Sequence, residues 1–484
     1  DVIRVEDTYY MVSTTMHFMP GCEILQSFDL VHWEHVTYVY ETLDHTDAQQ
    51  LKSGQNIYGQ GMWAASLRYH EGRFCICFVA NDTRKTYLYT SEKIDGPWKK
   101  QLIEGFYHDG SLLFDEDGRN YIVYGNDEIW ITELNEDLTA PKKDGLHRLL
   151  VSDHKNPELG YEGSHIQKIN GYYYIFLVHS LRDRWMRTEA CFYSDSLEGE
   201  FTGGDVLCDD RGYCGQGVAQ GGIVDTPDGK WYAMLFQDSG AVGRIPILLP
   251  VTWKDHFPFF GQNGHVPEEI EVHSTRPGYI YQPLVGSDDF CNGLLPRWQF
   301  NHDPDPRYYH LDALQGTYTI TTREVCTELT QAVNTLTQRM SYPSCAAEVT
   351  VDASALKEGD VAGLCALQSC YAAVGITKHH GKYEVLMLDK KEDGILDMTE
   401  GTVVESHQMD FRLEADFCNM KDEARCYYRV NKGDWLPIGT VHKLYFKLDH
   451  FTGCRFGLFC YAAEETGGSA CFRDFKYYDV DEIS

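Results

Sequence analysis

Two carboxyl side chains, Asp109 and Glu162, stand at matching positions before two similar strand-like segments, and Trp63 and Gln220 stand at matching positions before two more. Glu162, Trp63 and Gln220 each precede an aromatic residue by eleven positions. Asp109 precedes one by twelve, because its turn is one residue longer. The four aromatic residues are Phe74, Tyr121, Tyr173 and Trp231. Two carboxyls in such a polar and aromatic group can carry general acid and base catalysis.

Each of these residues also has a purely structural interpretation. Asp109 precedes Gly110 and can simply form a turn. Glu162 can be a solvated strand end, and Trp63 can pack against neighbouring strands. Their shared position in a repeat favours the catalytic interpretation, because a structural core would carry Val, Ile or Leu there.

The elements that must position these residues form an internal repeat. Five segments each combine a polar turn with an aromatic strand, and another apolar strand precedes each turn. The segments are 5–11, 70–76, 117–123, 169–175 and 227–233. Their recurrence, about every 50 to 60 residues without helical periodicity, predicts a five-bladed β-propeller. The alternative is a β-sandwich with many hairpins. In a propeller the first strands line one central channel, so residues at one offset converge on one cavity.

The pattern changes after residue 270. Residues 1–270 carry the propeller repeats, 271–287 contain the Pro and Gly residues of a predicted linker, and 288–484 show strands of alternating polarity. The strands expected in the last part include 346–351, 383–388 and 445–448. Such alternation predicts a β-sandwich. We therefore expect an all-β chain, a five-bladed propeller followed by a jelly-roll sandwich.

The 484 residues carry a formal net charge of −31. This charge repels nucleic acid and anionic lipid, and no basic patch offsets it, so we expect neither a nucleic acid nor a membrane as partner. No apolar run is long enough to span a bilayer. Most of the 16 Cys, such as Cys75 and Cys77 in one apolar strand, are expected to be buried thiols of a reducing compartment, which favours a cytoplasmic protein.

Over nearly all of its length the chain resembles glycoside hydrolase family 43, the arabinofuranosidase and β-xylosidase propellers. The segments that carry the resemblance are individually weak but specific in this order: 1–5 with 9–13, 62–69, 108–111, 161–163 with 171–174, 221–226, 243–244 and 250–253. Residues 334–339 and 471–475 are similar to the concanavalin-like domain appended to many of these enzymes. In such relatives this domain lies against the propeller rim and narrows the site.

The resemblance implies the catalytic roles. Glu162 matches the general acid, which must be protonated at the working pH, and Asp109 matches a second Asp that tunes and orients this acid. The general base is expected two residues before Asp1, where the repeat count from Tyr9 also falls. Asp1 itself is not given that role.

The resemblance also implies the residues that hold the sugar. Trp63 and Arg244 match an aromatic and an arginine contact, with an ion pair at a blade seam as the structural alternative for Arg244. Phe18 and Met16 are expected to form an apolar wall of the pocket. Gln220 is expected at the substrate, where several relatives carry a His beside a central metal. The chemistry requires no cofactor, and a structural Ca²⁺ is left open.

These roles predict an inverting exo-acting hydrolase that releases terminal α-L-arabinofuranosyl residues from arabinoxylan, arabinan or their oligosaccharides. A β-1,4-xylosidase acting on xylooligosaccharides is the alternative within the same class. An inactive glycan-binding propeller is the alternative from another class. In every case the expected partner is a plant cell-wall oligosaccharide or polysaccharide.

Overall fold

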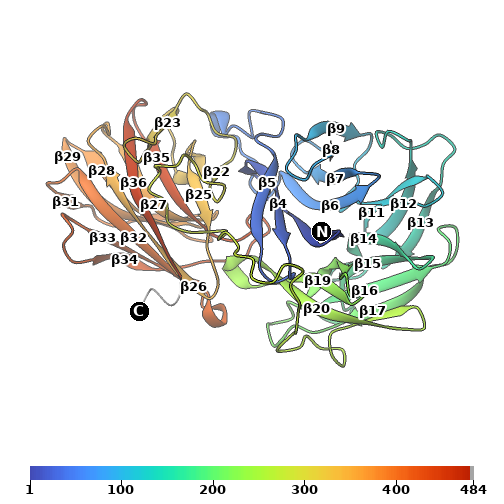
Figure 1. Cartoon of the computed structure of the whole chain (residues 1–484). Helices are drawn as coiled ribbons and strands as arrows, with labels where there is room; N and C mark the ends of the chain where they lie inside the picture. Colours follow the sequence, from blue (N-terminus) through green and yellow to red (C-terminus); the bar gives the residue numbers. More distant parts are fainter. Residues whose placement is uncertain (480–484) are drawn as a thin grey trace.

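The computed structural model describes residues 1–479 and shows two all-β bodies (Figure 1). The first, coloured blue to green, is a ring of five four-stranded sheets, and the second, orange to red, is a sandwich of two larger sheets. The predicted propeller followed by a β-sandwich is confirmed. Within the described residues, no helix has the length and apolar character needed to cross a bilayer.

Each blade is an antiparallel meander of strands that follow one another in the chain. Blade one contains β1 (Val2–Val5), β2 (Thr8–Ser13), β4 (Gly21–Ser27) and β5 (Glu34–Tyr40). Blade two contains β6 (Met62–His70), β7 (Arg73–Ala80), β8 (Lys85–Ser91) and β9 (Lys99–Ile103). Blade three contains β10 (Ser111–Phe114), β11 (Asn120–Asn126), β12 (Glu128–Leu134) and β13 (His147–Ser152). Blade four contains β14 (Glu162–Ile169), β15 (Tyr172–Ser180), β16 (Arg187–Ser194) and β17 (Thr202–Leu207). Blade five contains β18 (Ala219–Asp225), β19 (Trp231–Asp238), β20 (Arg244–Lys254) and β21 (Phe257–Phe260).

Apolar side chains between neighbouring blades hold the ring together. Ile24 of blade one and Phe78 of blade two are both fully buried in one cluster, because each strand presents alternate side chains to the next blade. An ion pair links the first and last blades, where Arg4 Nε donates to Asp225 Oδ1 at 3.2 Å. The first strands β1, β6, β10, β14 and β18 therefore surround one channel.

The first strands of blades two, four and five share a β-bulge near their heads. The bulges lie at residues 62–65 in β6, 162–165 in β14 and 219–222 in β18. A bulge inserts an unpaired residue and re-aims its side chain. Trp63 and Gln220 lie inside their bulges, whereas Glu162 is the last paired residue before its own. Equal spacing from the turns thus brings these three residues to one end of the channel, although they differ in their place relative to the bulge.

The sandwich packs two antiparallel sheets over one apolar core. The larger sheet contains β22 (Gln299–Asn301), β25 (Leu336–Arg339), β27 (Asp360–Leu367), β28 (Ala372–His379), β29 (Lys382–Lys390), β30 (Leu396–Met398), β31 (Thr402–Val404) and β35 (Arg455–Ala462). The other contains β23 (Tyr309–Asp312), β24 (Thr317–Thr321), β26 (Ser344–Asp352), β32 (Gln408–Asp416), β33 (Glu423–Arg429), β34 (Leu436–Lys443) and β36 (Ser469–Asp479). Short 3-10 turns occur at η1 (Lys52–Gly54), η2 (Gly240–Val242), η3 (Leu329–Gln331) and η4 (Cys418–Met420).

A propeller segment completes the larger sheet of the sandwich. β3 (Phe18–Met19), from the loop between β2 and β4, pairs with β22 through Met19 and Phe300. The predicted linker lies along blade one, where the Phe28 N–H donates to the Tyr281 hydroxyl at 2.8 Å. These backbone and side-chain bonds fix the sandwich against the propeller.

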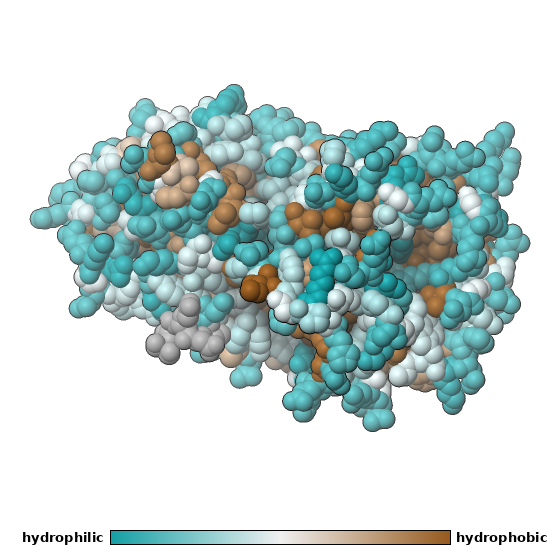
Figure 2. All heavy atoms as spheres, viewed as in Figure 1, coloured by the Kyte–Doolittle hydropathy of each residue, from teal (hydrophilic) through white to brown (hydrophobic). Residues whose placement is uncertain are grey.

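The predicted strand at 445–448 is wrong. These residues belong to the loop between β34 and β35, where the Tyr445 backbone bonds to the Gln368 side chain of the sandwich and to no strand that the structure describes. Phe451, further along the same loop, packs on Trp63 of the propeller. Cys75 and Cys77 are buried as expected, and no disulfide occurs among residues 1–479. Figure 2 shows a mainly hydrophilic face, in keeping with the high net charge.

Candidate active site

Asp109 and Glu162 come together at one end of the channel, from blades three and four. Asp109 stands just before β10 with a φ of 47° and is only 6% exposed. The backbone N–H of Gly163 donates to Asp109 Oδ2 at 3.1 Å, which ties the head of β14 to Asp109. Glu162 Oε2 accepts a hydrogen bond from Asn126 Nδ2 at 2.8 Å. Both predicted catalytic carboxyls therefore occupy one site.

His108 lies between the two carboxyls. Its Nε2 atom is 3.6 Å from Asp109 Oδ2 and 3.9 Å from Glu162 Oε2. One polar atom from each of the three side chains lies within 4.8 Å of the others, and no other such group of His, Cys, Asp or Glu occurs in the described part of the chain. Two members of this group are the predicted catalytic acids, so the group belongs to the candidate active site.

The charges of this group shift its protonation. Burial raises the pKa of Asp109 above its usual value, and the neighbouring His108 charge partly offsets this rise. Burial alone would lower the pKa of His108, but the charges of Asp109 and Glu162 outweigh burial and raise it to about 8. Arg84 opposes this rise. While these carboxyls are ionised, the imidazolium form of His108 is favoured at neutral pH.

Trp63 and Arg244 contact the same aromatic ring, that of Phe451. The Trp63 and Phe451 rings meet edge-on at 5.5 Å, and the Arg244 guanidinium lies 4.2 Å from the Phe451 centroid. Phe451 comes from the loop between β34 and β35, so the sandwich closes one side of the site. Trp63 also faces His108, with ring centroids 6.1 Å apart. Arg244 Nε also donates to Asp238 Oδ1 at 3.0 Å, but this ion pair joins β19 and β20 inside blade five and does not lie at a seam between blades.

Gln220 shapes the backbone beside Glu162. It has a φ of 70°, and its N–H donates to Glu189 Oε2 at 2.7 Å. A Cβ at Gly163 would stand 2.7 Å from the Gln220 side chain, so the bulge of β14 requires glycine there. Arg187 Nη2 donates to Gln220 Oε1 at 3.4 Å.

The predicted place of Phe18 in the pocket wall is wrong. Its side chain is 0% exposed, since β3 carries it into the sandwich sheet. The Arg455 guanidinium lies 3.8 Å from its ring centroid, and His17 packs against it at 4.3 Å. Phe18 therefore stabilises the domain interface. Met16 is also buried, at 1% exposure.

Asp1 has a structural role below the site. Its Oδ2 accepts hydrogen bonds from the Leu67 N–H at 2.9 Å and from Arg68 Nη1 at 2.5 Å. Its Oδ1 lies 3.2 Å from His165 Nδ1, and the side chain is 1% exposed. A buried carboxylate with these partners cannot activate a water at the sugar.

Sequence reasoning missed two site residues, His108 and Phe451. His108 adjoins Asp109 inside a segment that carries the family resemblance, so its position was a usable signal. Phe451 had no local signal, because its place depends on how two distant parts of the chain pack together.

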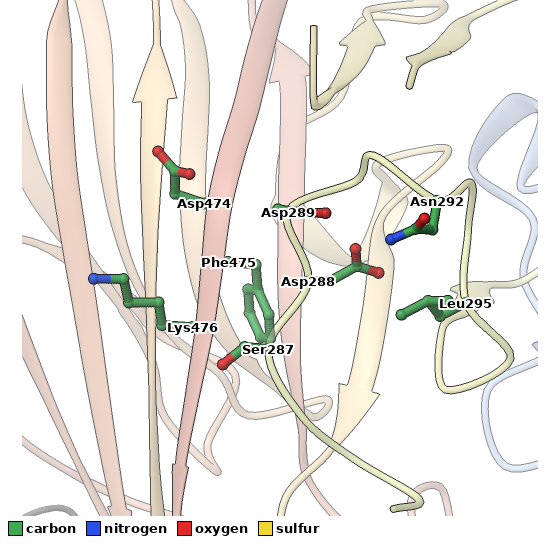
Figure 3. A pocket seen from close by; sticks show the side chains of 8 residues that line it. All are labelled: Ser287, Asp288, Asp289, Asn292, Leu295, Asp474, Phe475 and Lys476. Atoms are coloured by element: carbon green, nitrogen blue, oxygen red, sulfur yellow. The ribbon is translucent and has the colours of Figure 1, made fainter. Parts of the chain in front are cut away.

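A hollow on the sandwich, beside β36, lies outside this site (Figure 3). Its polar lining includes Asp288, whose Oδ2 accepts from Trp298 Nε1 at 2.8 Å and whose Oδ1 accepts from the Phe290 N–H at 2.7 Å. These bonds hold the start of the sandwich domain to its core. We assign this hollow to the fold.

The family comparisons match both bodies of the chain. The model described as "Glycosyl hydrolases family 43" matches residues 1–258. The chain belongs to glycosyl hydrolase family 43. A second model, "Beta xylosidase C-terminal Concanavalin A-like domain", matches residues 287–478. The predicted family and its appended domain are thus confirmed, and the chain is a family 43 glycosidase.

Several family 43 relatives extend over most of this chain. A protein of Formosa agariphila named beta-xylosidase is 26% identical and aligns with 99% of this chain and 87% of its own length. A protein of Bacteroides ovatus named non-reducing end alpha-L-arabinofuranosidase is 23% identical and aligns with 82% of this chain and 77% of its own length.

Solved structures also resemble this family 43 chain closely. A bifunctional GH43-CE protein of Bacteroides eggerthii has a TM-score of 0.91 and 42% identity, and the match covers 100% of this chain but 62% of that one. This chain thus spans less than two thirds of that protein. An engineered GH43 hydrolase, described as displaying both endo-xylanase and exo-arabinofuranosidase activity, has a TM-score of 0.85 and 27% identity, covering 99% of this chain and 97% of its own.

Proposed function

We propose that this protein is an inverting, exo-acting glycoside hydrolase that releases terminal α-L-arabinofuranosyl residues from arabinoxylan, arabinan or their oligosaccharides. The observation that carries the proposal is the meeting of Asp109 and Glu162 around His108, beside the rings of Trp63 and Phe451. Carboxyls supply acid and base chemistry, and aromatic rings supply faces on which a sugar stacks.

In the proposed reaction Glu162 protonates the oxygen of the leaving group as the glycosidic bond breaks. Asp109, held by the Gly163 N–H, orients and tunes this acid. Arg244 and Trp63 hold the terminal sugar, and Phe451 blocks one side of the pocket, which favours attack at a chain end. Inversion also requires a base that activates water on the opposite face of the sugar. Its predicted position lies two residues before Asp1, and this assignment stays a prediction.

A β-1,4-xylosidase acting on xylooligosaccharides is the second candidate. The names of the relatives favour it, since the proteins from Formosa agariphila and Xylanibacter ruminicola are named beta-xylosidase and putative beta-xylosidase. The arabinofuranosidase from Bacteroides ovatus and the engineered exo-arabinofuranosidase support the first candidate. Both substrates are plant cell-wall glycans that end in a pentose.

Hydrolysis of aryl α-L-arabinofuranoside and aryl β-D-xyloside by the full-length gene product tests the proposal. We expect a higher kcat/KM on the arabinofuranoside and release of free arabinose from arabinoxylan oligosaccharides. A preference for the xyloside would establish the second candidate instead. No turnover of either compound, together with measurable oligosaccharide binding, would overturn both candidates in favour of a glycan-binding propeller.

A further inference from the structure

The carboxyl group of Glu162 is held asymmetrically. Its Oε2 atom accepts a hydrogen bond from Asn126 at 2.8 Å and is the oxygen that faces His108 Nε2 at 3.9 Å. Its Oε1 atom makes no hydrogen bond with any residue that the structure describes. A carboxyl held in this way keeps negative charge on the bonded oxygen and presents the other oxygen for proton transfer.

The charged groups around His108 come from several blades. Asp109 adjoins it on the same loop, Glu162 faces it from β14, and Arg84 faces it from the turn between β7 and β8. Arg187 of β16 acts on the same cluster through Glu162, and Arg244 of β20 acts through Asp109. Burial opposes an imidazolium at His108, whereas Asp109 and then Glu162 favour it and raise its pKa to about 8. The Asp109 charge makes the largest single contribution to this rise, so the imidazolium is still favoured while Glu162 carries its proton.

We propose that His108 is a positioning residue for the general acid, because its imidazolium stabilises the Glu162 carboxylate that forms when the proton departs. The inference rests on the proposed function, in which Glu162 is that acid. His108 acts through Glu162 and not on the sugar itself. Its ring also contacts Trp63, at 6.1 Å between centroids, so the sugar-binding aromatic and the acid share one support.

The proton balance of the step is as follows. The proton on Glu162 Oε1 moves to the glycosidic oxygen, the bond between that oxygen and the anomeric carbon breaks, and its electron pair stays on the leaving oxygen. Glu162 becomes a carboxylate, whose charge lies beside the His108 imidazolium and the Asn126 amide. A water molecule attacks the anomeric carbon and supplies the new hydroxyl of the sugar, and the proton that it loses passes to the general base and on to solvent. A proton from solvent later restores Glu162. His108 keeps its own proton throughout.

The sign of the expected pH effect follows from this charge. A cation beside Glu162 stabilises the carboxylate form of this side chain relative to the protonated form. Replacing His108 with Asn removes that stabilisation. We expect the alkaline limb of the kcat/KM profile to move up by about one pH unit or more. The weaker acid should also lower the plateau about tenfold for substrates with poor leaving groups.

The test measures pH profiles of kcat/KM for wild type, His108→Asn, His108→Gln and His108→Lys on an oligosaccharide and on an aryl glycoside with a good leaving group. In the Asn and Gln variants the alkaline limb of the kcat/KM profile should move to higher pH on the oligosaccharide and stay in place on the aryl glycoside. In the Lys variant this limb should return to its wild-type pH. His32→Asn is the matched control, since His32 pairs with Asp29 at 2.9 Å on blade one and should change nothing. Thermal unfolding establishes that each variant is folded.

The proposal would be overturned if the alkaline limb of the kcat/KM profile on the oligosaccharide stayed in place, or moved to lower pH, in both His108→Asn and His108→Gln. The same shift of the alkaline limb in His108→Lys would overturn it too, because the positive charge at position 108 would then not set the position of this limb. An NMR titration of the Glu162 carboxyl in wild type and His108→Asn keeps the test independent of turnover, with the same upward shift expected. Absence of turnover in the wild type would contradict the proposed function, whereas the NMR shift reports on His108 alone.

Discussion

Asp109 holds its carboxyl in place with a backbone conformation that residues other than glycine rarely adopt. A φ of 47° is uncommon for a side chain with a Cβ, and such strain costs on the order of 1 to 3 kcal/mol. The hydrogen bond from the Gly163 N–H helps to offset this strain. Because Gly163 follows Glu162, the same bond fixes the head of the strand that carries the acid.

Replacing Asp109 with Asn removes the charge and nearly keeps the shape of the side chain. We expect kcat/KM on a natural oligosaccharide to fall by about 100-fold or more, because the acid loses the group that tunes it. Asp117→Asn is the control in the same blade, since the Asp117 side chain is 44% exposed and should be dispensable. Equal activities of the Asp109→Asn variant and the wild type would contradict the assigned role.

The site residues differ in how well the sequence predicts them. Trp63, Asp109 and Glu162 share a position in a repeat, and a repeat places equivalent residues at the same end of one channel. Phe18 lies outside the repeat, in the loop that becomes β3, so nothing local distinguished a pocket wall from a domain contact. The structure supplies the backbone pairing that decides between them.

Three histidines pack together at the junction between β3 and the sandwich. His17 lies 4.8 Å from His302 and 5.3 Å from His450 between ring centroids, and all three side chains are buried. His302 Nε2 accepts the Ile57 N–H at 3.0 Å, so this nitrogen carries no proton in the folded protein. Burial and then His450 lower the pKa of His302 to about 3.

This cluster makes the stability of the junction dependent on pH. In the unfolded chain His302 gains a proton below about pH 6.5, whereas in the folded chain it stays neutral down to about pH 3. Between these values the unfolded state binds more protons, so stability is present above pH 6.5 and falls as the pH falls. The loss from this one residue is on the order of 3 kcal/mol between pH 6.5 and 4.

His302→Asn should therefore reduce the dependence of the unfolding free energy on pH between 6.5 and 4. Chemical denaturation at a series of pH values measures this dependence. The control is His273→Asn, because the His273 side chain is 62% exposed and should leave the dependence unchanged. If His302→Asn and the wild type lost stability equally on acidification, the histidine account of this junction would be wrong.

The strands, like the site residues, differ in how well the sequence predicts them. Blades follow from hairpins whose partners are close in sequence, so periodicity alone predicted them. β3 pairs with a strand about 280 residues away, and Tyr445 is held by the side chain of the distant Gln368, so no local pattern reveals either. Alternation of apolar and polar residues predicted a strand at 445–448, but the Tyr445 backbone bonds to the Gln368 side chain in place of a partner strand.

The two domains form a single functional unit. Met19 of the propeller pairs with Phe300 of the sandwich, and Gln299 Nε2 donates to the Pro20 carbonyl at 2.6 Å. These contacts place the loop between β34 and β35 at the mouth of the channel, where Phe451 reaches Trp63. The sandwich therefore contributes directly to the shape of the site.

Phe451→Ala should weaken substrate binding more than it slows chemistry. The ring contacts Trp63 and the Arg244 guanidinium, and losing such contacts is worth about 1 to 2 kcal/mol, which corresponds to a rise in KM of about 5- to 30-fold. Steady-state kinetics on the preferred aryl glycoside measure both constants. Leu448→Ala is the control, because Leu448 lies in the same loop and its side chain is 64% exposed. An unchanged KM in Phe451→Ala would show that the sandwich does not shape the site.

The most direct test of the whole account is the activity of Glu162→Gln on substrates with different leaving groups. If Glu162 is the acid, its replacement should lower kcat on a natural oligosaccharide by about 100-fold or more and spare aryl glycosides whose leaving group needs no proton. Glu158→Gln, an exposed neighbour in the preceding loop, should behave as wild type. Undiminished turnover of the oligosaccharide by Glu162→Gln would contradict the account.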